Sequence, residues 1–227
     1  MSEPQVLELA LRVPRREVLR YLGYPRGRRP RPAIARRLDE LWPEASGLLR
    51  ARGALRLVDR AAAEAAGMPR PSERVAVGAC TLGPALEAEG ERRGAAGDAL
   101  DALLLDAFGS AAAEAAADAL EAPLCALARA EGLAPERRVS PGYGRWPVAG
   151  QGALLALLPV DALGLRLTDG LMMVPRKSVS FAARLRAGAA ARERGQTPAA
   201  HRCAACTHDP CPYRQAAAAP DEEGGPS

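Results

Sequence analysis

The longest helical pattern in this 227-residue sequence begins at Asp98 and extends to about Ala130. Asp98 is a preferred helix-capping residue type, and Pro123 is expected to kink or break the helix. Shorter helical patterns cover 14–22, 33–50, 85–93 and 151–158. Apolar strand patterns lie at 54–58, 75–80, 165–168, 171–174 and 178–185. This order predicts an α+β domain whose helices flank a mainly antiparallel sheet.

Three segments of the chain differ in pattern. We expect residues 1–72 to form an N-terminal helical segment that packs on the main domain. Residues 73–186 hold most of the strand patterns and the longest helix, and we expect them to form that domain. Residues 187–227 read as a Cys-rich C-terminal appendage that consists of a linker, a Cys/His metal-binding knuckle and a disordered tail.

The formal net charge is +4, and the densest basic run is the arginine-rich stretch 26–32. Acids and bases mix over the rest of the chain and aromatic residues make up only 4%, so we do not expect nucleic-acid binding. No secretory signal pattern is visible, and no apolar run approaches the roughly 18 residues of a membrane span. Clustered cysteines are typical of a reducing compartment, which favours a cytoplasmic protein without membrane partners.

Residues 138–147, Arg-Val-Ser-Pro-Gly-Tyr-Gly-Arg-Trp-Pro, have the features of a binding loop. The proline restricts the backbone, and the two glycines lack the Cβ atom that would keep a ligand away from main-chain amides. Arg138 provides a planar fork of donors that suits a carboxylate or a phosphate. Tyr143 and Trp146 place two aromatic rings beside this cation. A simple surface turn is the alternative interpretation.

The sequence after this loop strengthens the first interpretation. A helical run follows, and then 167–180 reads Leu-Thr-Asp-Gly-Leu-Met-Met-Val-Pro-Arg-Lys-Ser-Val-Ser. This order of motifs resembles the activation (reactivation) domain of vitamin B12-dependent methionine synthase. The likeness extends over roughly 75–181, including Thr-Leu-Gly-Pro at 81–84 and the long helix around Phe108.

The resemblance implies an S-adenosylmethionine site. In that family the arginine before the Pro-Gly-Tyr turn binds the ligand carboxylate, and Arg138 stands at this position. Ser140, Gly142 and Tyr143 match loop positions that meet the same ligand, partly through the backbone. Glu114 matches a glutamate of the long helix that engages the ligand.

Two further ligand contacts of the family have no clear counterpart. Residues 181–200 contain no tyrosine, although the family has one beyond the Ser-Val-Ser strand. The family also has an acidic residue near the start of the domain, and no confident match emerges among Asp39, Glu40 and Glu44.

The resemblance also implies a function. The chain would assist the reductive methylation of cobalamin on a partner protein, either a methionine synthase or a related corrinoid methyltransferase. If the chain is an active enzyme, it would transfer the methyl group of S-adenosylmethionine to cob(I)alamin. An electron-transfer protein is a further candidate partner. Two alternatives stay open: an S-adenosylmethionine-dependent methyltransferase with another substrate, and a non-catalytic, metal-bearing interaction module.

A second candidate site lies near the end of the sequence. Cys203, Cys206, Cys211 and His208 have spacing that suits either a zinc ion or an iron-sulfur cluster. A disordered tail with reactive thiols is the alternative. Further candidates for a remaining ligand are His201, Cys80, Cys125 and a partner protein.

Overall fold

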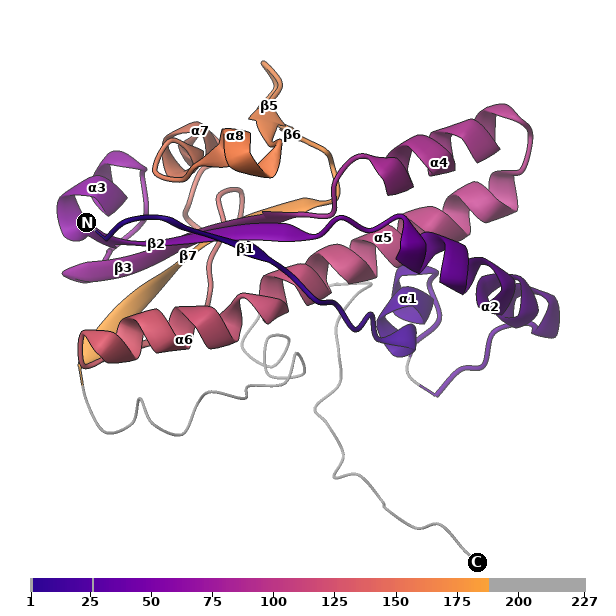
Figure 1. Cartoon of the computed structure of the whole chain (residues 1–227), viewed down its shortest axis with the longest axis horizontal. Coiled ribbons are helices and arrows are strands. Elements are labelled where there is room, and N and C mark those ends of the chain that lie inside the picture. The colour runs from indigo at the N-terminus through magenta and orange to yellow at the C-terminus, as the bar shows by residue number, and fades with distance from the viewer. Residues whose placement is uncertain (1, 26, 188–227) are drawn as a thin grey trace, which may run out of the picture.

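A five-stranded antiparallel sheet forms the centre of the computed structural model, which describes residues 2–25 and 27–187 (Figure 1). Each neighbouring pair of strands in this sheet is antiparallel. The strands are, in sheet order, β1 (Gln5–Glu8), β2 (Arg52–Asp59), β3 (Arg74–Thr81), β7 (Ser178–Ala187) and β4 (Leu133–Pro135). The predicted α+β fold with a mainly antiparallel sheet is confirmed.

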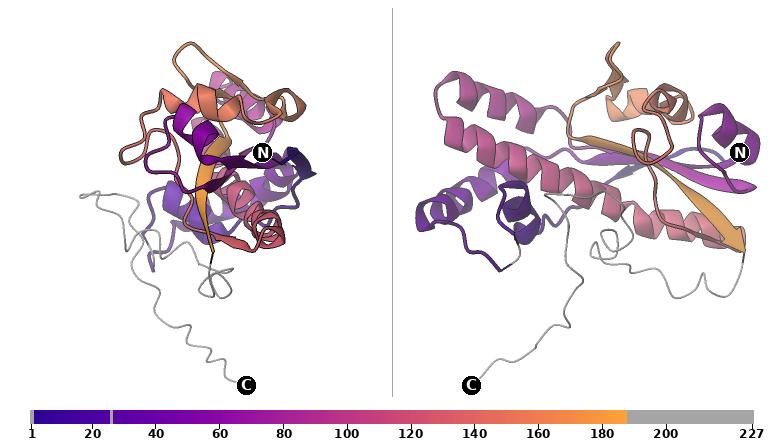
Figure 2. Two further views of the ribbon diagram at one scale, coloured as in Figure 1. Left: turned by 90° about the vertical axis from the view of Figure 1, so that its left-hand side faces the viewer. Right: turned by 180° about the vertical axis from the view of Figure 1, so that it is seen from behind.

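Helices cover both faces of the sheet (Figures 1 and 2). The first face carries α1 (Arg15–Tyr21), α2 (Pro32–Gly47), α5 (Ala99–Ala119) and α6 (Glu121–Ala130). The second face carries α3 (Arg60–Ala65), α7 (Gly150–Leu155), α8 (Val160–Leu163) and a hairpin of β5 (Arg166–Leu167) and β6 (Met173–Val174). Helix α4 (Ala85–Ala95) packs along the first half of α5.

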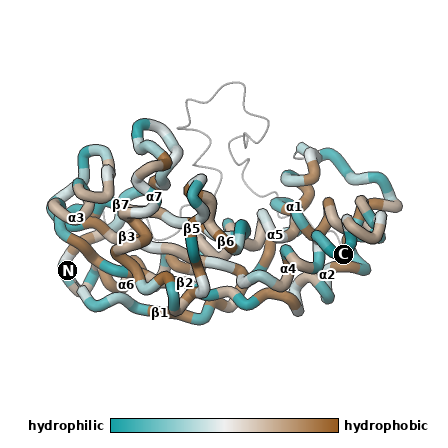
Figure 3. The backbone as a smooth tube through the Cα atoms, turned by 90° about the horizontal axis from the view of Figure 1, so that it is seen from above, coloured by the Kyte–Doolittle hydropathy of each residue, from teal (hydrophilic) through white to brown (hydrophobic). Residues whose placement is uncertain are grey.

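Alternating side chains on the strands produce two hydrophobic cores. On β2, Leu55 and Leu57 belong to the first core, between the sheet and α5, whereas Ala54 and Val58 belong to the second. Strand β3 is buried on both faces from Val75 onward. Figure 3 shows hydrophobic residues along β3 and β7. A strand with both faces covered needs no polar alternation, which explains its continuous apolar run.

The structure corrects several sequence-based expectations. Residues 2–72 are not a purely helical segment, because β1 and β2 come from it and pair within the sheet. Strand β2 contains the strand pattern predicted at 54–58, whereas β1 was not predicted. Strand β1 is an edge strand with mostly exposed residues, so it carries no apolar pattern. The other elements that the sequence did not predict are all six residues or shorter: α3, β4 and α8.

The predicted break in the long helix lies at Leu120, between α5 and α6. Pro123 occupies the first turn of α6, where a residue without an N–H costs no helical hydrogen bond. Asp98 is the N-cap residue of α5 as predicted, but its side chain makes no capping hydrogen bond. Within residues 2–25 and 27–187, no helix is long and apolar enough to cross a bilayer.

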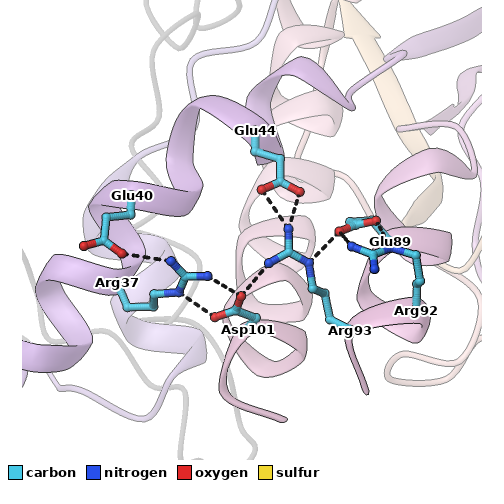
Figure 4. A network of polar contacts seen from close by, with 7 residues as sticks. All are labelled: Arg37, Glu40, Glu44, Glu89, Arg92, Arg93 and Asp101. Atoms are coloured by element: carbon cyan, nitrogen blue, oxygen red, sulfur yellow. Dashed lines mark hydrogen bonds and ion pairs between the residues drawn. The ribbon is translucent and has the colours of Figure 1, made fainter. Parts of the chain in front are cut away.

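An ion-pair network around Asp101 joins α2, α4 and α5 (Figure 4). Arg37 donates to both carboxylate oxygens of Asp101, at 2.7 and 2.6 Å, and Arg93 adds a third bond at 2.7 Å. Arg93 also bonds to Glu44 and Glu89. The Asp101 side chain is only 7% exposed. The bonds from Arg37 lower the pKa of Asp101, against the opposing effect of burial.

Trp146 fixes the 138–147 loop on the second core. Its indole is 2% exposed and donates a hydrogen bond to the Ala66 carbonyl just after α3, at 3.0 Å. A Cβ atom at Gly150 would lie 2.4 Å from the indole nitrogen and 2.7 Å from the Ala66 oxygen. Only glycine therefore allows the indole and the Ala66 carbonyl to meet at this point.

We expect Asp101→Asn to lower the free energy of unfolding by about 3 kcal/mol at pH 7, because two arginines then lose a buried counter-charge. The folded-state pKa of Asp101 lies below the unfolded value of about 3.9, so its contribution is present above that value and is lost as the pH falls through the folded pKa. Urea unfolding between pH 7 and pH 2 should therefore show a flatter pH dependence in the variant.

Glu40→Gln is the matched control for this network, because Glu40 pairs with Arg37 on the exposed side. Glu40→Gln should lower the free energy of unfolding by less than about 1 kcal/mol. Equal losses for the two variants would contradict the central role of Asp101.

We expect Gly150→Ala to destabilise the fold by about 1–3 kcal/mol in urea unfolding, because the methyl group would displace the Trp146 ring. Gly152→Ala is the matched control in the same helix, where the nearest atom to a new Cβ, on Leu167, is at an ordinary 3.9 Å. The control should be neutral or stabilising by less than about 1 kcal/mol. A neutral Gly150→Ala variant would show that Trp146 does not anchor the loop.

Candidate ligand-binding site

The turn at 140–143 has the rigid geometry that the sequence predicted. Tyr143 donates its N–H to the Ser140 carbonyl at 3.2 Å. Pro141 occupies the second position of the turn, and Gly142 occupies the third with a φ of 88°. A positive φ at the third position is the requirement of a type II turn and favours glycine there.

The main-chain amides of Gly142 and Tyr143 are bonded within the loop, so at these two residues they are not open to a ligand as we expected. Gly142 donates its N–H to the Trp146 carbonyl at 2.8 Å, and Trp146 donates to the Tyr143 carbonyl at 3.1 Å. Together with the Tyr143 bond across the turn, these bonds close the loop upon itself. Any contribution of Gly142 to ligand binding would therefore come from the space that its missing side chain leaves.

The two aromatic residues of the loop have different environments. Tyr143 is 76% exposed and is available at the surface. Trp146 points into the second core and cannot lie beside the cation as we expected. Phe181 of β7 takes that position, with its ring centroid 5.2 Å from the guanidinium carbon of Arg138. This distance is within the range of a cation–π contact.

Arg138 lies at the edge of β7 and reaches across the sheet to α5. The next residue, Val139, forms a bridge with Ala182 of β7 through two backbone bonds of 2.8 Å. The Arg138 guanidinium donates from Nη1 to the Ala117 carbonyl and from Nη2 to the Asp118 carboxylate. Its side chain is only 16% exposed.

Glu114 stands one helical turn before Asp118 on α5, so the two carboxylates share a face of that helix. Burial raises the pKa of Cys80, in β3, to about 12; Arg138 opposes this rise, whereas Glu114 and Asp118 add to it. Burial also raises the pKa of Tyr21, in α1, and the Glu114 charge adds to the effect. Arg138, Glu114 and Asp118 therefore all act on the Cys80 thiol of the first core, and Glu114 acts on Tyr21 as well.

Asp118 and Phe181 both contact Arg138, and the sequence alone identified neither of them. The position of Asp118 could have been noticed, because it follows Glu114 by four residues in the predicted long helix and so shares its face. The position of Phe181 could not, because its place under the guanidinium depends on how the loop crosses the edge of β7.

The other sequence-based candidates lie elsewhere or outside the described residues. Three acids near the start of the chain pair with arginines of the helical layer: Asp39 with Arg15, Glu40 with Arg37 and Glu44 with Arg93.

The metal candidates Cys203, Cys206, Cys211 and His208 fall beyond the described ranges. Cys80 is buried and Cys125 is half-buried on α6. Nowhere in 2–25 or 27–187 do three His, Cys, Asp or Glu residues form a group that could hold a metal ion.

The similarity of this chain to known proteins lies in its structure. No protein-family model matches the chain, and no curated protein matches it. Among solved structures, the chain is similar to the crystal structure of the MetH reactivation domain bound to AdoHcy, with a TM-score of 0.58 and 16% sequence identity. The similarity covers 80% of this chain and 78% of that chain. The chain therefore has the fold of the MetH reactivation domain, as its loop and strand motifs predicted.

Proposed function

We propose that this chain binds S-adenosylmethionine beside the second half of α5 and assists the reductive methylation of cobalamin on a partner protein. The partner would be a methionine synthase or a related corrinoid methyltransferase. The fold supports this proposal, because the similar MetH reactivation domain was solved with AdoHcy bound.

The observation that carries the proposal is the setting of Arg138. The family resemblance implies that this arginine binds the ligand carboxylate, and its guanidinium is held between Phe181 and the end of α5. A guanidinium can bind a carboxylate through two parallel hydrogen bonds, which fixes the orientation of the ligand as well as adding charge. An arginine that is already ordered loses less freedom when it binds.

Glu114 provides the complementary charge. A half-buried carboxylate near the same region can attract either the amino group or the sulfonium centre of S-adenosylmethionine. Ser140, Gly142 and Tyr143 would border the ligand from the side of the loop. Arg138 and Glu114 together match the zwitterionic amino-acid end of this ligand.

The main contribution of the protein to this reaction would be to position the methyl donor. A one-electron donor first reduces cob(II)alamin to cob(I)alamin. The Co(I) centre then attacks the methyl carbon, the carbon–sulfur bond breaks with its electron pair on sulfur, and S-adenosylhomocysteine leaves. Because the nucleophile is already reduced cobalt and the leaving group is a neutral thioether, no general base is required.

We expect Arg138→Ala to weaken the binding of S-adenosylmethionine by about 10- to 100-fold in isothermal titration calorimetry, as the loss of a charged hydrogen-bonding partner predicts. Arg166→Ala is the matched control, because Arg166 is an exposed arginine of the β5–β6 hairpin on the other face of the sheet. It should leave the affinity unchanged. Equal affinities for wild type and Arg138→Ala would contradict the proposed site.

A second experiment distinguishes the three functional classes. The chain is incubated with a corrinoid methyltransferase in the cob(II)alamin state, S-adenosylmethionine and a low-potential reductant, and methylcobalamin is followed by its absorbance. Methylcobalamin formation that depends on the chain supports reactivation. Ligand binding without methylcobalamin favours a methyltransferase with another substrate, and no ligand binding favours an interaction module.

The C-terminal cluster adds a separate proposal about metal. Cys203, Cys206, Cys211 and His208 would hold an iron-sulfur cluster or a zinc ion, and an iron-sulfur cluster could deliver the electron for cobalamin reduction. Elemental analysis of anaerobically purified protein tests this directly. Iron and sulfide near the stoichiometry of a cluster support electron delivery, zinc supports a structural role, and a metal-free preparation contradicts both.

A further inference from the structure

Asp118 is the one acidic side chain that contacts the Arg138 guanidinium within residues 2–25 and 27–187. It lies in the last turn of α5 and accepts a hydrogen bond from Nη2 of Arg138. Its neighbour Ala117 accepts the bond from Nη1 through its main-chain carbonyl. With the Phe181 ring against the guanidinium, three groups of the folded chain hold this cation.

The remaining donors of Arg138 have a defined direction. A guanidinium carries five N–H groups, and the two contacts with α5 engage its two terminal nitrogens. The Nε–H makes no hydrogen bond within the described part of the chain. The edge formed by Nε and one terminal nitrogen is one of the two edges that can bind a carboxylate through paired bonds.

We infer that Asp118 is a positioning residue, which orients Arg138 so that its Nε edge receives the carboxylate of S-adenosylmethionine or S-adenosylhomocysteine. This inference rests on the proposed function. Asp118 acts with a main-chain carbonyl of the same helix turn, and that carbonyl cannot swing away from Arg138. The pair therefore holds the arginine in the unliganded protein instead of competing with the ligand for it.

The expected effect follows from side-chain ordering. An arginine without its carboxylate partner samples more rotamers, and this freedom is lost when the ligand binds. Asp118→Ala should therefore weaken S-adenosylhomocysteine binding by about 5- to 10-fold. Asp118→Asn keeps an oxygen acceptor for Nη2, so its affinity for S-adenosylhomocysteine should fall less, by about 2- to 3-fold.

A pair of ligands separates this role from general damage to the fold. S-adenosylhomocysteine carries the carboxylate, whereas 5′-methylthioadenosine retains the adenosine and thioether but lacks the amino-acid end. Calorimetric titration of the full chain should show weaker S-adenosylhomocysteine binding by Asp118→Ala and unchanged 5′-methylthioadenosine binding. Equal losses for both ligands would overturn the inference, and so would an Asp118→Ala variant that binds S-adenosylhomocysteine as well as or better than wild type.

A double-mutant comparison tests whether Asp118 acts through Arg138. In an Arg138→Ala background, Asp118→Ala should cause no further loss of S-adenosylhomocysteine affinity. Additive losses would show that Asp118 acts on its own and would contradict a positioning role. Failure of the proposed function looks different, because wild type would then bind neither ligand.

Discussion

The close packing of α5 on the sheet determines most of this structure. The helix buries a series of alanines against the strands, including Ala112 and Ala116, which have no exposed surface. These small side chains let the axis of α5 approach the sheet. Two glycines of the strands give space to large side chains in the same core. A Cβ at Gly53 would lie 2.8 Å from Leu120, and one at Gly78 would lie 2.6 Å from Phe181. The end of α5 therefore comes within reach of a side chain at the edge of β7.

The sequence predicted elements best where apolar runs were long and bounded by breakers. The β3 and β7 strands and the long helix all satisfied this condition. Strand β1 could not be predicted in the same way, because an exposed edge strand needs no apolar face. Strand β4 has only three residues, and its pairing with β7 comes from tertiary structure and not from local pattern.

At the candidate site, too, the sequence predicted features that depend on neighbouring residues and missed those that depend on tertiary contacts. The motif around Arg138 and the helical position of Glu114 could be read from the sequence. The packing of Phe181 against Arg138, the bond from Arg138 to Asp118 and the burial of Trp146 could not, because each depends on segments far apart in the chain. The physical consequence is a turn in which the amides of Gly142, Tyr143 and Trp146 are bonded within the loop itself.

In the proposed function, the arginine held between β7 and the end of α5 binds the amino-acid end of the methyl donor. The most direct test is a titration of ¹⁵N-labelled full chain with S-adenosylhomocysteine, followed by two-dimensional NMR. The account predicts that the amide signals of Ala117, Asp118 and the non-proline residues of 139–143 shift as ligand is added. These shifts should saturate when each chain has bound about one ligand molecule. The absence of saturable shifts, or shifts confined to the second face of the sheet, would contradict it.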